Sequence, residues 1–162
     1  MAESTATRTE LATSKPRAFQ AVFWGGLIAG VLDLAYAILV YSPRQPILIP
    51  QTIASGVLGA IAYDLGATSA SLGVFFHFLI AFTAAAVFYA ASRKLPWLTR
   101  RAILAGLIYG ALVYVFMHSV VLPLSAVAPS RMKLLPRLAE FVEHWFLVGL
   151  PIALSVRRFA PR

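Results

Sequence analysis

The chain has no cysteine among its 162 residues, and this absence excludes several kinds of chemistry. Without thiols there is no disulfide framework, no iron–sulfur cluster and no thiolate zinc site. Charged residues are also scarce, at 12% of the chain, against roughly 25% in an ordinary soluble domain. So little polar surface cannot cover a water-facing globule, and we therefore expect the apolar surface to face lipid.

Acidic residues are the scarcer charge type, with 6 Asp and Glu against 14 Lys and Arg and a formal net charge of +8. A positive balance can indicate nucleic-acid binding, which needs a concentrated basic face. Here the basic residues gather at the ends of apolar segments instead, which is typical of membrane topology signals. The sequence thus predicts the lipid bilayer as the partner, and no nucleic acid.

Long apolar runs are what the chain does have. Four of them reach the roughly 20 residues needed to cross about 30 Å of hydrocarbon. They cover residues 19–41, 69–91, 101–122 and 138–156. The first lacks a clear cleavage site, so it is interpreted as a retained helix and not as a signal peptide. We expect an all-α fold, a transmembrane four-helix bundle over residues 19–158, preceded by a polar cytoplasmic tail at 1–18.

The connection between the first two spans is long enough to hold an additional element. Pro43, Pro46 and Pro50 favour an extended first part. The following stretch, 51–63, predicts a helix of roughly 20 Å, too short to span the membrane. It is expected to be an interfacial or re-entrant helix on the extracytoplasmic side, either as a lid on the bundle or as a half-helix lining an access path. Residues 123–136 form the second outer connection.

The distribution of Lys and Arg predicts the orientation. With the N-terminus inside, ten basic residues are cytoplasmic and four are outside, as the positive-inside rule requires. The expected location is the bacterial inner membrane, with both termini cytoplasmic.

Six ionisable residues fall within the predicted spans, where such groups are costly and by default mark a functional site. They are Asp33, His77, His118, Glu140, Glu143 and His144. Counted from the outer helix ends, the Asp and the three His lie in one layer roughly 7 to 12 Å deep, and the two Glu lie slightly above it. Small residues at helical spacing place each group on a face suited to packing inward.

Two pairs of glycines spaced by four residues accompany these polar groups, at Gly26 and Gly30 and at Gly106 and Gly110. Such pairs let helix backbones approach closely in lipid. We expect them to pack within one bundle and not to form a dimer face.

Three interpretations of the polar layer remain open. It is a structural network in a non-catalytic accessory or assembly subunit, or a site for a proton or a divalent metal ion such as Zn²⁺. The third is a b-type haem held between two histidines, with Arg44, Arg131 or Arg137 at the propionates. No cofactor is required by the sequence. It contains no recognisable nucleophile motif or phosphate loop, so it assigns no enzyme class, and the substrate and any homo-oligomer or membrane-complex partner stay open.

Several short stretches resemble those of a group of small bacterial inner-membrane proteins that have no assigned activity. The chain is also distantly similar to the YagU-type proteins. The stretches are 24–30 (WGGLIAG) followed by Asp33, 51–56 (QTIASG), 91–96 (ASRKLP), 121–125 (VLPLS) and 148–153 (VGLPIA). The resemblance covers residues 19–158, supports the membrane assignment and implies no catalytic residue.

Overall fold

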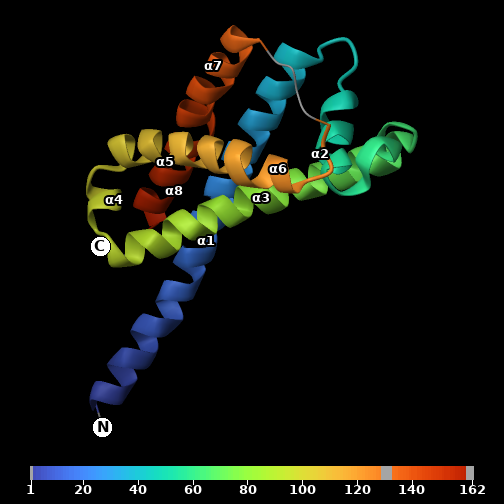
Figure 1. Ribbon diagram of the computed structural model, residues 1–162. Helices are drawn as coiled ribbons and strands as arrows, with labels where there is room; N and C mark the ends of the chain where they lie inside the picture. Colours follow the sequence, from blue (N-terminus) through green and yellow to red (C-terminus); the bar gives the residue numbers. More distant parts are fainter. Residues whose placement is uncertain (1, 129–132, 160–162) are drawn as a thin grey trace.

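The computed structural model describes residues 2–128 and 133–159. It is 88% helical, without strands in the described part. Four helices are long and apolar enough to cross a membrane, namely Arg17–Tyr41, Gly66–Lys94, Ala102–Leu124 and Leu134–Phe159. This confirms the all-α fold with four spans, each within a few residues of the predicted bounds (Figure 1).

The spans are built from several elements, two of which are π-helical. In chain order these are α1 (Ala2–Tyr41), α2 (Leu48–Leu58), the 3₁₀ helix η1 (Gly59–Tyr63), α3 (Gly66–Lys94), α4 (Trp97–Arg100), α5 (Ala102–Phe116), the π segment η2 (Met117–Val121), α6 (Leu122–Leu124), α7 (Leu134–Glu143), the π segment η3 (His144–Gly149) and α8 (Leu150–Phe159). The third span is therefore α5–η2–α6, and the fourth is α7–η3–α8.

Each π segment lies just before a proline, Pro123 in one span and Pro151 in the other. A proline cannot donate a hydrogen bond to the carbonyl four residues earlier, and kinks and π turns arise where this ladder is broken. Those carbonyls belong to Ser119 and Leu147, which lie inside the two π segments. The prolines thus explain why both helices widen at these places.

Glycines set the closest helix contacts. A Cβ added at Gly26 or Gly30 would collide with Phe82 or Phe78 of α3. Gly106 and Gly110 of α5 lie equally tightly against η3, where the backbone of Gly149 faces both. Both predicted glycine pairs therefore pack within the bundle, and Gly149 is a third contact point that the sequence analysis missed.

One half of the bundle holds the apolar core. Its buried residues include Ala21, Ala85, Phe88, Ala105, Ile152 and Val156. Large apolar side chains cover the outside of the spans, for example Phe75, Val87 and Leu112, each more than half exposed. This distribution is that of a bundle whose outer surface faces lipid.

Both long connections meet at one end of the molecule. The Ala126 N–H donates to the Gly56 carbonyl at 2.9 Å, and the Tyr41 hydroxyl donates to the Pro136 carbonyl at 3.3 Å. At the opposite end, α4 packs against α8 near the end of the described chain (Figure 1). The spans therefore alternate in direction, as the topology requires.

The short helix begins earlier than predicted. It includes Pro50 in its first turn, so the prediction that this part is extended was wrong. A proline is tolerated there because first-turn N–H groups have no partner within the helix. The helix packs on α3 so closely that a Cβ at Gly73 would collide with the Pro50 carbonyl.

Candidate functional site

The structure brings the six predicted ionisable residues together from every span. Asp33 is on α1, His77 on α3, His118 in η2, Glu140 and Glu143 on α7, and His144 in η3. All except Glu143 line one cavity of about 320 Å³. Ile49, Thr52 and Ile53 of α2 also line it, so the short helix forms one wall of the polar layer.

Each histidine lies beside a different carboxylate. The distance is 2.7 Å from His144 Nδ1 to Glu143 Oε2, 3.7 Å from His118 Nε2 to Glu140 Oε2, and 3.8 Å from His77 Nε2 to Asp33 Oδ2. The two longer pairs exceed hydrogen-bond distance. They join the third span to the fourth and the second to the first.

Backbone carbonyls orient all three imidazole rings. His77 Nε2 is 2.8 Å from the Gly30 carbonyl, His118 Nδ1 is 3.1 Å from that of Tyr114, and His144 Nδ1 is 3.0 Å from that of Glu140. Because a carbonyl only accepts, these nitrogens donate, and the other nitrogen of each neutral ring carries a lone pair. A ring fixed in this way is the usual arrangement of a histidine that binds a metal.

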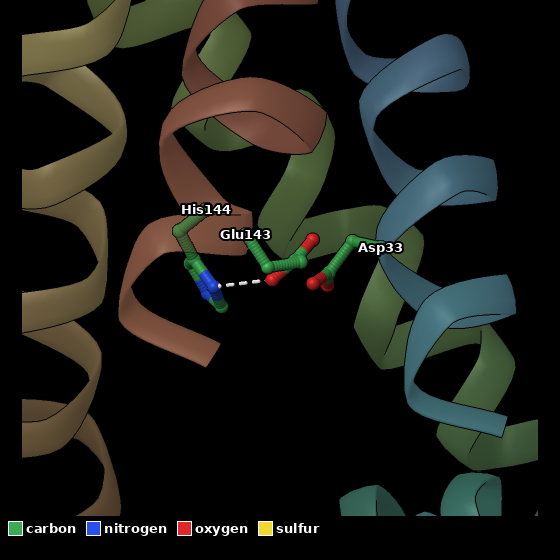
Figure 2. A group of neighbouring side chains, drawn as sticks. All are labelled: Asp33, Glu143 and His144. Carbon is green, nitrogen blue, oxygen red and sulfur yellow. Dashed lines mark ion pairs between the residues drawn. The ribbon is translucent and has the colours of Figure 1, made fainter. Parts of the chain in front are cut away.

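The tightest group consists of Asp33, Glu143 and His144, whose candidate ligand atoms all lie within 4.8 Å of one another. Figure 2 shows the Glu143 carboxylate between the other two side chains. The Glu143 side chain is only 3% exposed. Its Oε2 lies 2.7 Å from His144 Nδ1, whereas its Oε1 has no hydrogen-bond partner within the described part of the chain.

This arrangement leaves a buried carboxylate beside a second carboxylate. Two such groups repel each other when both are ionised, and burial removes the water that would screen them. A proton or a metal cation between them relieves this repulsion. The group can therefore hold a cation.

Tyr114 is a site residue that the sequence analysis did not select. Its ring stacks on His118 at a centroid distance of 4.0 Å and meets His144 edge-on at 5.3 Å. The side chain is buried and thus fixes both rings. The available signal was its position one helical turn before His118, on the same face.

Glu140 and His144 are four residues apart, which places them on one face of a helix, and both line the cavity. In the structure His144 begins the π segment and lies beside the adjacent Glu143, while the Glu140 carboxylate lies near His118. His144 is therefore the residue at which the regular α-helix gives way to a π turn. Such turns often occur at functional sites, and both π segments here contain a histidine of the cavity.

Two of the three residues proposed for the haem propionates do not line the cavity. Arg44 and Arg137 are exposed and are not among the residues that line it. Arg131 lies outside the described residues. The haem interpretation stays a prediction for an absorption spectrum to test.

The fold is that of a multi-pass α-helical membrane protein. No protein family, curated protein or solved structure that was compared matches the chain. The resemblance to the YagU-type proteins therefore stays a prediction, and the functional argument depends on the cavity and its side chains.

Proposed function

We propose that this protein binds a divalent metal ion inside the membrane, at Asp33, Glu143 and His144. The observation that carries the proposal is Glu143, a buried carboxylate that lies beside a second carboxylate and has the His144 imidazole 2.7 Å away. A divalent cation supplies the positive charge that this arrangement lacks.

The ligand types indicate which metals suit the site. Carboxylate oxygen together with imidazole nitrogen suits ions of intermediate hardness, with Zn²⁺ as a representative. The ligands come from α1, α7 and η3. A metal bound between Glu143 and His144 Nδ1 replaces the proton on that nitrogen, since only a deprotonated nitrogen can be a ligand. The site thus resembles a preformed set of ligands more than an incidental surface cluster.

Proton handling is a second candidate function, supported by the two longer histidine–carboxylate pairs. His77 with Asp33 and His118 with Glu140 line the cavity at 3.8 and 3.7 Å, just beyond direct hydrogen-bond distance, so a small side-chain rotation or a water beside both groups connects each pair. Histidine and carboxylate chains of this kind form proton relays in membrane proteins. Asp33 belongs to both sets, so a proton and a metal compete for it.

The proposal includes a location, the bacterial inner membrane with both termini cytoplasmic. Its support is the charge at one end of the bundle, where α3, α4 and α8 end and α5 begins. The basic residues there are Arg93, Lys94, Arg100, Arg101, Arg157 and Arg158. The polar cavity then lies in the outer leaflet.

Zinc titration of the detergent-purified protein tests the metal site. We expect one zinc site per chain. Its affinity should fall at least roughly tenfold in Glu143→Gln, because loss of a residue that only orients a metal ligand already lowers metal affinity by that factor. Asp64→Asn is the matched control, since Asp64 is an exposed acid on the turn before α3. Equal affinity in wild type and Glu143→Gln would overturn the metal proposal. Absence of zinc binding together with a destabilised Glu143→Gln variant would favour a structural role in an accessory subunit.

A further inference from the structure

A second cavity, of about 490 Å³, lies between the second and third spans. Its walls are almost entirely apolar, with Leu79, Thr83 and Val87 on α3 and Tyr109, Leu112 and Phe116 on α5. Leu79, Val87, Leu112 and Phe116 are each about half exposed or more. In a membrane, this groove opens sideways to the hydrocarbon chains of the bilayer.

The groove exists because α3 and α5 have few direct contacts. Tyr109 is the main bridge, since its hydroxyl donates to the Ala84 carbonyl at 2.7 Å and its ring meets Phe88 at 5.0 Å. α3 packs mainly against α1 and α2 instead, and α5 packs against the fourth span. The groove therefore lies beside the Tyr109 contact, where α3 and α5 are not packed against each other.

The apolar groove adjoins the polar cavity. Ile80, Ala84, Val113 and Met117 line both. Only these side chains separate the groove from the cavity that holds Asp33, His77 and His118. Sites of these volumes, apolar with a few polar groups at one end, are typical for small lipophilic ligands.

We infer that the groove binds a lipid with one alkyl or isoprenoid chain and a neutral hydroxyl headgroup, which reaches into the polar cavity. The headgroup chemistry follows from what lines that cavity. Among the described residues no Lys or Arg lines it, and Asp33 and Glu140 do. An anionic headgroup finds no cation there, because each histidine already lies beside a carboxylate.

A hydroxyl headgroup, by contrast, complements the cavity. Carboxylate oxygens and the free lone pairs of the oriented imidazoles are acceptors, so a ligand must donate to them. A hydroxyl donates one hydrogen bond and carries no charge whose burial must be compensated. The inference concerns the cavity lining alone and does not require a metal at Glu143, which is not part of that lining.

Photolabelling with two matched probes tests this inference. The probes are hexadecanol and hexadecanoic acid, each carrying a diazirine on the chain, added to the protein in phosphatidylcholine nanodiscs. We expect the alcohol to label Leu112 and Met117 roughly tenfold more than the acid does, because the acid would place a charge beside carboxylates. Equal labelling by both probes, at the level of the remaining lipid-facing surface, would mean that bilayer chains fill the groove, and would overturn the inference.

Two variants on α3 test the path from groove to cavity. Ala84→Phe fills the shared wall and should reduce groove labelling by the alcohol to the level of the acid, whereas Ala86→Phe, on the exposed face of the same helix, should leave it unchanged. Unchanged labelling in a folded Ala84→Phe would count against the inference.

The comparison of the alcohol with the acid uses the wild-type protein alone, so it does not depend on whether a variant folds. Glu143→Gln should lose zinc and keep the labelling, so the two proposals can fail separately.

Discussion

The carboxylate of Glu143, on the fourth span, lies directly beside that of Asp33 on the first, with candidate ligand atoms within 4.8 Å (Figure 2). His144 completes the group from the other side. The pair ties the two spans together only when a cation or a proton lies between them, because two buried carboxylates otherwise repel each other. The occupancy of this site is therefore coupled to the stability of the bundle.

Asp33→Asn should act in opposite directions with and without metal. In metal-free protein it removes the repulsion and offers an amide donor to Glu143, so the free energy of unfolding should rise by about 1 kcal/mol. With Zn²⁺ present, the variant lacks a ligand and should lose the stabilisation that zinc confers on the wild type. Thermal unfolding in detergent, with EDTA and with zinc, measures both. A variant less stable than wild type in EDTA would contradict this account of the pair.

Zinc affinity should increase from about pH 6 to about pH 8, because protons compete for the lone pairs of carboxylate and imidazole ligands. Binding is then weakest at acid pH, with a slope of up to about tenfold per pH unit for each proton released. Titrations in a series of buffers measure this slope. A flat profile would mean that the titratable groups of the cavity are not the ligands.

Gly110→Ala should destabilise the bundle by about 1 to 3 kcal/mol, since overpacked sites cost this much. The added methyl would collide with the His144 carbonyl, so zinc affinity should fall as well. Gly25→Ala is the matched control, because there the methyl would meet Ile152 Cα at an ordinary 3.4 Å. Similar unfolding temperatures for the two variants would contradict the close packing of α5 on η3.

Reporter fusions test the proposed orientation. Fusions after Pro50 and after Ala128 should be exported, whereas a fusion after Pro96 should stay cytoplasmic, because the basic residues gather at the α4 end. Enzymatic reporters active on only one side of the membrane give this result directly. The opposite pattern would place the polar cavity in the inner leaflet.

Much of this fold follows from hydropathy. The four spans were predictable because each is a long apolar run, and the common depth of Asp33, His77 and His118 follows from alternating helix directions. Which carboxylate lies beside which histidine was not predictable. That pairing depends on the orientation of side chains in the folded bundle, where His144 lies beside the adjacent Glu143 and the Glu140 carboxylate lies near His118 of the third span.

Other features depend on tertiary contacts that leave no periodic signal in the chain. Pro50 was expected in an extended segment, yet it fits the first turn of α2 because that helix starts two residues before it. The role of Gly149 is visible only once α5 lies against η3. The groove beside Tyr109 likewise results from how α3 and α5 are placed, and not from their own sequence patterns.

The most direct test of the central claim is the metal content of protein purified without added metal, measured with its oxidised and reduced absorption spectra. We predict a stoichiometric divalent metal in the wild type and in Asp64→Asn, its loss in Glu143→Gln, and no haem band in any of them. A metal content unchanged in Glu143→Gln, or a haem band that disappears on changing His77, would contradict a metal site at Asp33, Glu143 and His144.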